Sequence, residues 1–120
     1  MSPSVDNTVT QVPAGAPACA PGSRPVVAFV RLSFPDGIDR TRARSIAIAA
    51  QSMFQGMPAL RSKVFTVCES TRELVNVYLW DCEQAARAFF TEALLALVAE
   101  HYGTRPRVEF AEVDAIVDNR

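Results

Sequence analysis

Four segments of the chain combine apolar runs with the residue types that favour β-strands. Val26–Phe34 is an almost continuous apolar and β-branched run, which suits a central strand. Leu60–Cys68 and Leu74–Trp80 predict two further strands, joined by a polar turn at residues 69–72. Val108–Val117 predicts a last strand. The pattern therefore predicts four strands, of which the second and third form a hairpin.

The segment between the first two strands has the apolar spacing of a helix with one buried face. It runs from about Asp39 to Phe54, and Gly56 and Pro58 follow it as stop signals. Its apolar positions recur at intervals of three and four residues: Ala43, Ile46, Ala47, Ala50, Met53 and Phe54.

A second helix is predicted between the third and fourth strands. We expect Asp81 to cap its first turn, with Gln84 as the capping-box partner three residues on. Thr91-Glu92 marks a candidate bend within this helix, and Gly103 is expected to end it.

The order β-α-β-β-α-β predicts an α+β fold of the ferredoxin-like type, an antiparallel four-stranded sheet with two helices on one face. The first strand is largely apolar on both sides, so the face turned away from the helices needs a cover of its own. A second copy of the same sheet is the most economical cover. We therefore expect a homodimer.

Residues 1–24 are rich in Pro, Ala, Ser, Gly and Val and carry few charges. Such a segment buries too little apolar area to offset the entropy lost on ordering. The sequence predicts a disordered tail over residues 1–24 and one folded domain over residues 25–120. A docking role for the tail is the alternative.

Composition narrows the class of protein. The chain has 120 residues, of which 49% are apolar and 21% charged, with a net charge of −1. These values fit one globular domain. The chain lacks the excess of basic residues that proteins use to bind nucleic acid through its phosphates. No apolar run approaches the roughly 18–20 residues that cross a bilayer, so we expect no membrane partner.

The three cysteines, Cys19, Cys68 and Cys82, have irregular spacing and form neither a CxxC motif nor a zinc pattern. We expect them to be three reduced thiols of a cytosolic protein. The first ten residues have no basic n-region and no apolar h-region. Both observations predict a cytoplasmic location.

The predicted hairpin brings together the side chains that are best suited to a binding site. If Ser70-Thr71 forms the turn, six side chains share one face: Arg61, Lys63 and Phe65 opposite Trp80, Tyr78 and Asn76 respectively. Large rings, an amide and two cations suit an aromatic-walled pocket with a few directed polar groups. The alternative is a plain core beneath the helices, with the two cations reaching along its edge toward water.

His101 is the only histidine and falls in the last turn of the second predicted helix. It is a candidate general base, and the alternative is a helix-end surface residue. A single histidine cannot build a three-histidine zinc site or a two-histidine iron site. Nucleotide-binding, phosphate-loop and serine-hydrolase motifs are absent as well. We expect neither a metal nor an organic cofactor.

Three segments, MPALRSKVF, VNVYLWDCEQAARAFF and AEHYGTRPRVEFAEVDAIVDN, resemble the YdhR-type monooxygenases of the dimeric α+β barrel superfamily. The resemblance spans roughly residues 26–119. Its most specific pieces are YLW before an acidic helix start, the helix-ending HYG and the terminal VDN. It implies the ferredoxin-like fold and its assembly into a dimeric barrel.

The superfamily includes cofactor-independent monooxygenases that oxidise polycyclic phenols to quinones in antibiotic and aromatic polyketide pathways. Those enzymes place an asparagine four residues before a tryptophan, and Asn76 and Trp80 match this pattern. The resemblance implies that Trp80 lines the pocket and that Asn76 binds the substrate oxygen or an oxygen species. Haem-degrading members carry a histidine on the following helix, where this chain has Phe89-Phe90, and an asparagine on the first strand, where it has none.

We therefore expect a small-molecule enzyme, a cofactor-independent monooxygenase that oxidises an aromatic or polyketide-type phenol to a quinone. The expected catalytic residues are Asn76, Trp80 and His101. The expected substrate-binding residues are Arg61, Phe65, Tyr78, Phe54 and Phe90. Two alternatives stay open: an oxygen-independent cyclase or isomerase on a similar substrate, and a non-catalytic dimeric ligand-binding protein.

Overall fold

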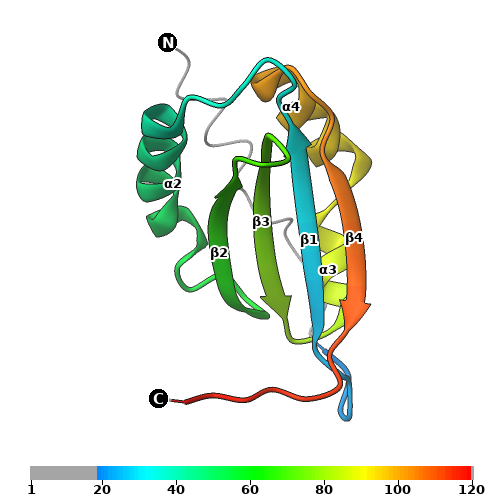
Figure 1. Cartoon of the computed structure of the whole chain (residues 1–120). Helices are drawn as coiled ribbons and strands as arrows, with labels where there is room; N and C mark the ends of the chain where they lie inside the picture. The colour runs from blue at the N-terminus through cyan, green and yellow to red at the C-terminus, as the bar shows by residue number, and fades with distance from the viewer. Residues whose placement is uncertain (1–18, 120) are drawn as a thin grey trace.

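The structure is a computed structural model that describes residues 19–119. Four antiparallel strands form one sheet in the order β2-β3-β1-β4 (Figure 1). Their bounds are β1 Val26–Ser33, β2 Leu60–Cys68, β3 Glu73–Trp80 and β4 Arg107–Glu112. This strand order and the placement of the helices between the strands confirm the predicted ferredoxin-like fold.

The first helix, α2, spans Arg40–Phe54. Asp39 caps it, because its carboxylate accepts a hydrogen bond from the backbone N–H of Arg42. No residue of α2 is fully buried, and the helix lies beside the β2 edge of the sheet (Figure 1). It contacts the helix-covered face through its last residue, Phe54, which packs edge-on against Phe65 and Tyr78.

The second predicted helix is two helices, α3 Glu83–Phe89 and α4 Glu92–Tyr102, which cover the far side of the sheet in Figure 1. The break falls at the predicted bend, where Thr91 accepts a hydrogen bond from the N–H of Leu94 and starts a new helix. Gly103 ends α4 in the left-handed conformation, as predicted. No helix in the described residues is long and apolar enough to cross a membrane.

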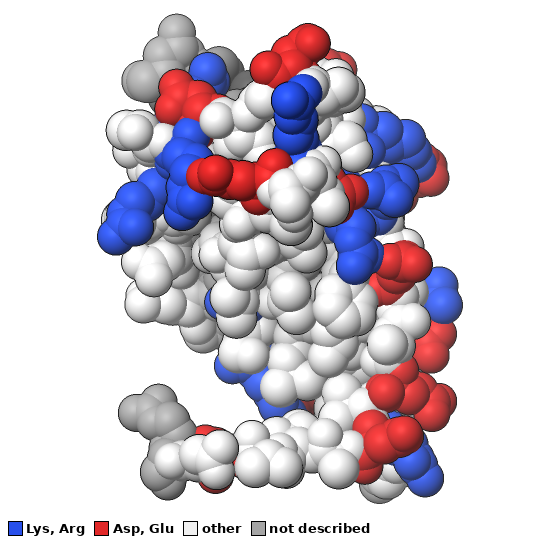
Figure 2. All heavy atoms as spheres, viewed as in Figure 1, with Lys and Arg blue, Asp and Glu red and all other residues white. Residues whose placement is uncertain are grey.

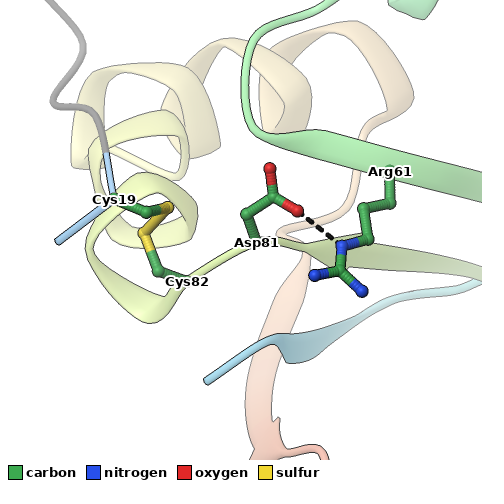
Figure 3. Close-up of a disulfide and its surroundings, with 4 residues drawn as sticks. All are labelled: Cys19, Arg61, Asp81 and Cys82. Carbon is green, nitrogen blue, oxygen red and sulfur yellow. Dashed lines mark hydrogen bonds and ion pairs between the residues drawn. A yellow bond between two sulfur atoms is a disulfide. The ribbon is translucent and has the colours of Figure 1, made fainter. Parts of the chain in front are cut away.

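Asp81 does not cap α3, which corrects the predicted capping box. The N-cap position is Cys82, whose side chain makes no capping hydrogen bond. The Asp81 carboxylate instead accepts a hydrogen bond from Arg61 at the end of β2, 2.5 Å from Nε to Oδ1 (Figure 3).

The core lies between the sheet and the helices α3 and α4. Val26, Ala28, Val30 and Leu32 of β1 are buried on this side, and the intervening residues of β1 are only half-buried. The β2–β3 register places Phe65 opposite Asn76 and Lys63 opposite Tyr78, as predicted.

An irregularity between Leu60 and Ser62 changes the end of this hairpin. Leu60, and not Arg61, is the partner of Trp80. An extra residue in one strand breaks the strict alternation of sides, so the predicted pairing of Arg61 with Trp80 is wrong.

Strand β4 ends at Glu112, five positions before the predicted Val117. The chain beyond it runs away from the sheet toward the C-terminus (Figure 1). Ile116 and Val117 are 51% and 82% exposed on this segment, so nothing within the described chain buries them.

Cys19 and Cys82 form a disulfide across a sequence separation of 63 residues (Figure 3). The prediction of three reduced thiols is therefore wrong for these two, and Cys68 alone is free. Disulfides persist in oxidising compartments, so the thiol argument for a cytoplasmic location no longer holds.

The disulfide also moves the boundary of the domain. Cys19 packs against the buried core, so residues 19–24 are not part of a disordered tail. Residues 1–18 lie outside the described part of the chain, and the tail prediction for them stays a prediction.

We predict that the unreduced protein titrates one thiol per chain with Ellman's reagent and that the reduced, unfolded protein titrates three. The free thiol should react readily near neutral pH, because hydrogen bonds from Ser70 and Thr71 lower the pKa of Cys68 to about 7. The Cys82→Ala variant should lose about 2–4 kcal/mol of unfolding free energy in urea titrations. Three reactive thiols without reduction would contradict the disulfide.

Candidate functional site

The side chain of Tyr78, on β3, is the centre of a cluster of aromatic rings. It stacks on Trp80 at a centroid distance of 6.0 Å and meets Phe90 edge-on at 5.0 Å. Phe89 and Phe54 each lie 6.1 Å from it. Rings from β3, the α3–α4 junction and α2 therefore meet in one cluster beside the site.

A cavity of about 950 Å³ lies between α2, α4 and the helix-facing side of the sheet. Four of the predicted substrate-binding residues line it: Phe54, Phe65, Tyr78 and Phe90. The cavity therefore lies on the face of β2 and β3 that the hairpin hypothesis assigned to a binding site. Trp80 and Tyr78 are nevertheless buried in the core, as the plain-core alternative expected, while Phe54, Phe65 and Phe90 are less buried and border the cavity.

Asn76 and His101 also line the cavity. Asn76 is half-buried on β3 between Val30 and Phe65 of the neighbouring strands, so its amide is a directed polar group among apolar neighbours. His101 is exposed in the last turn of α4, where its ring lies 4.8 Å from that of Tyr102. The structure thus places these two predicted catalytic residues on the wall of one cavity. Asn76 is half-buried there, whereas His101 is exposed to solvent.

Trp80 does not line the cavity. It is 2% exposed and packs beneath the wall, against Tyr78, Phe89 and Phe90. Its indole N–H is buried and has no hydrogen-bond partner among the described residues. The resemblance placed Trp80 on the pocket wall, whereas the structure gives it the role of supporting that wall.

Arg61 is also outside the cavity. The irregularity in β2 shifts it away from the ring-bearing face, and its guanidinium pairs with Asp81 at the exposed end of the hairpin (Figure 3). This placement removes the predicted substrate contact of Arg61.

Lys63 also lines the cavity, and although it belonged to the predicted hairpin face it was not among the expected catalytic or substrate-binding residues. Its ammonium nitrogen lies 3.5 Å from the ring centroid of Phe54, 4.2 Å from that of Phe65 and 4.5 Å from that of Tyr78. Burial lowers the pKa of Lys63 to about 7, whereas burial raises the pKa of the Tyr78 hydroxyl. A usable signal was present in the sequence: Lys63 is its only lysine.

The ionisable groups around the cavity carry no negative charge at neutral pH. No aspartate or glutamate is among the described residues that line it. Arg40, Arg42 and Arg44 of α2 contribute positive charge, together with Lys63. Within residues 19–119, no cluster of three or more His, Cys, Asp or Glu side chains could hold a metal ion. The site therefore favours an acidic or anionic ligand with a large apolar surface.

No family model matches the chain, and no curated protein matches it. Solved structures do match. A protein of unknown function from Nitrosomonas europaea has a TM-score of 0.59 at 17% identity, covering 81% of this chain and 96% of that one. A monooxygenase from Streptomyces coelicolor, in complex with nanaomycin D, has a TM-score of 0.56 at 18% identity, covering 81% and 94%.

A cofactor-independent oxygenase from Streptomyces nogalater has a TM-score of 0.50 at 15% identity, covering 81% of this chain and 98% of that one. The chain has the fold of these oxygenases. At such identities the similarity establishes the fold alone and does not separate the YdhR-type family from others that share it.

We predict that Trp80→Phe destabilises the protein without abolishing ligand binding. Removing part of a buried ring system should lower the free energy of unfolding by about 1–2 kcal/mol, measured by urea titration with circular dichroism. The affinity for anthrone, measured by equilibrium dialysis without oxygen, should change by less than about threefold, which is within ~0.7 kcal/mol. Unchanged stability with a tenfold loss of affinity would place Trp80 on the ligand.

Proposed function

We propose that this protein is a cofactor-independent monooxygenase that oxidises an aromatic or polyketide-type phenol to a quinone. The observation that carries the proposal is the cavity, whose wall combines aromatic rings, two amides (Asn76 and Gln51) and exclusively basic or phenolic ionisable groups. Its volume of about 950 Å³ is large enough for a flat ligand of three or four fused rings.

The reaction proposed for the cavity needs an anion that can reduce dioxygen. Loss of a proton converts an anthrone-type phenol into an electron-rich anion, which passes one electron to O₂. The two radicals combine to form a C–O bond, and protonation gives a hydroperoxide. Its O–O bond then breaks with loss of water, so one oxygen atom remains as the quinone carbonyl and the other leaves as H₂O.

The protein must stabilise the charge that develops on the substrate oxygen. The Asn76 amide is a directed donor on the wall, and a fixed dipole aimed at a developing oxyanion stabilises it. Tyr78 stays protonated, because burial raises its pKa, so its hydroxyl is available as a donor. Trp80 acts indirectly by holding the ring of Tyr78 in place.

The structural neighbours support this proposal. One is a monooxygenase with nanaomycin D bound, and another is a cofactor-independent oxygenase. Both share the arrangement of sheet and helices that encloses the cavity here.

We predict that the chelator-treated protein accelerates oxygen uptake by anthrone above the spontaneous rate. Asn76→Ala should lower kcat/KM by about 100-fold, since it removes a donor to the developing oxyanion. Gln84→Ala is the matched control, because it removes an amide from an exposed position on α3 and should leave the rate within about twofold. An oxygen electrode measures both.

Two results would contradict the oxygenase. Equal rates for Asn76→Ala and the native chain would remove Asn76 from the reaction. Absence of protein-dependent uptake with anthrone and naphthol substrates would favour one of the alternatives. Conversion of a bound ligand without oxygen would then indicate a cyclase or isomerase, and binding without conversion a ligand-binding protein.

We also propose that the chain is a homodimer. On the sheet face away from the helices, Phe29, Val77 and Val64 lie at one level of β1, β3 and β2, and Val64 is 53% exposed. Figure 2 shows uncharged residues across the middle of this face, with the charged residues gathered toward its margins. An apolar face with a charged rim is typical of an interface between copies.

We predict that light scattering after gel filtration gives the mass of two chains for the native protein. Val77→Arg should weaken dimerisation at least about 100-fold, because it buries an unpaired charge in the interface. Ala96→Arg adds the same charge at an exposed position of α4 and should leave the dimer intact. A monomeric native chain at micromolar concentration would contradict the proposal.

A further inference from the structure

Lys63 lies among aromatic rings and forms no ion pair with a described carboxylate. Three rings surround its ammonium nitrogen, one each from α2, β2 and β3. No described carboxylate is within ion-pair distance of it, although six arginines elsewhere each pair with an acid. Ring faces stabilise a cation far less than a carboxylate does, so the positive charge of Lys63 lacks a counter-ion unless a ligand brings one.

The choice of lysine at this position is informative. The chain has 12 Lys and Arg residues, and Lys63 is the only one of them that is not arginine. Arginine holds its proton under all ordinary conditions, whereas a buried lysine can release it and take it back. Among the lysine and arginine side chains, the one with this ability therefore lies on the wall of the cavity.

The groups that face Lys63 do not supply a competing base among the described residues. The neighbour on β3 is Tyr78, whose hydroxyl burial keeps protonated, and those on α2 and β2 are the phenylalanines. Around the rest of the cavity, α2 contributes Arg40, Arg42 and Arg44, and α4 contributes His101 and Tyr102. His101 was the base expected from the sequence, but it is exposed to water, whereas Lys63 is half-buried among three rings that line the cavity.

We propose that the amine of Lys63 is the proton acceptor for an acidic polycyclic phenol bound in the cavity, and that the ammonium then stays beside the phenolate as its counter-ion. This inference rests on the proposed function, since it names the base and the ligand class of the same site. The phenolic O–H bond breaks, its proton forms a new N–H bond at Nζ, and the electron pair of the broken bond remains on the substrate oxygen. The three ring faces stabilise the ammonium so formed.

The neutral amine is available for this step near pH 7, because burial lowers the pKa of Lys63 to about 7. An ordinary surface lysine would be almost entirely protonated at that pH and could not accept the proton.

Alizarin tests the proposal, because this tricyclic phenol changes its visible absorption when it ionises. We expect the bound dye to ionise with an apparent pKa about one unit or more below that of the free dye, a tenfold shift in the equilibrium. Lys63→Met should abolish this shift, whereas His101→Gln should keep it. Arg87→Gln removes an exposed cation that does not line the cavity and should also keep it.

Lys63→Arg separates the two parts of the role. It retains the positive charge and should therefore keep part of the dye shift, but it cannot accept a proton and should not restore oxygen uptake. An equal shift in the native chain and Lys63→Met, or no binding of alizarin by the native chain, would overturn the proposal. If a variant fails to fold, the apparent pKa of alizarin bound to the native chain still tests the proposal, because a bound dye with the pKa of the free dye would contradict it.

The dye assay needs no oxygen, so the two proposals fail separately. A shift in the pKa of bound alizarin that depends on Lys63, without any oxygen uptake, would refute the oxygenase and still support Lys63 as the proton acceptor. Oxygen uptake by Lys63→Met at the native rate would refute the role of Lys63 and leave the oxygenase.

Discussion

The packing of aromatic rings around Tyr78 is the constraint on which the rest of the structure depends. Consecutive residues Phe89 and Phe90 lie with their rings perpendicular, 4.9 Å apart, at the point where α3 ends. Both therefore reach the same strand and line the cavity, and Phe89 is also part of the buried core. The break between α3 and α4 makes this possible, since a continuous helix would turn two successive side chains about 100° apart. The same rings bind the sheet to the helices and form the boundary of the site.

The position of Lys63 follows from that packing and is costly for the fold. A lysine enclosed by rings is desolvated, and the lowered pKa of its amine reflects this loss of hydration. A methionine of similar length would fill the same space without that cost. Stability alone does not explain a lysine here, whereas a need for a base beside a phenolic ligand does.

Much of the fold could be predicted from the spacing of apolar residues and from the turn-forming and helix-ending residues between the elements. Alternation along β3 placed Asn76, Tyr78 and Trp80 on one face, and the strand order followed from the sequence of elements. The irregularity that moves Arg61 could not be predicted, because an extra residue in a strand leaves no mark on the apolar pattern. The early end of β4 has a similar cause: Ile116 and Val117 are strand-forming residues, but no neighbouring strand pairs with them within the described chain.

Other features depend on contacts between residues far apart in the sequence. Cys19 and Cys82 bond across the fold, and irregular spacing gave no sign of it. Spacing also could not show that Trp80 lies under the wall, since that depends on how Phe89 and Phe90 pack.

The most direct test of this account is the pKa of Lys63 in the native protein without ligand. Because the chain has one lysine, incorporation of lysine labelled with carbon-13 at Cε gives a single side-chain signal in the NMR spectrum. We predict that this signal titrates with a pKa of about 7. A pKa near the ordinary value of 10.5 would show a solvated ammonium at the site and would contradict it.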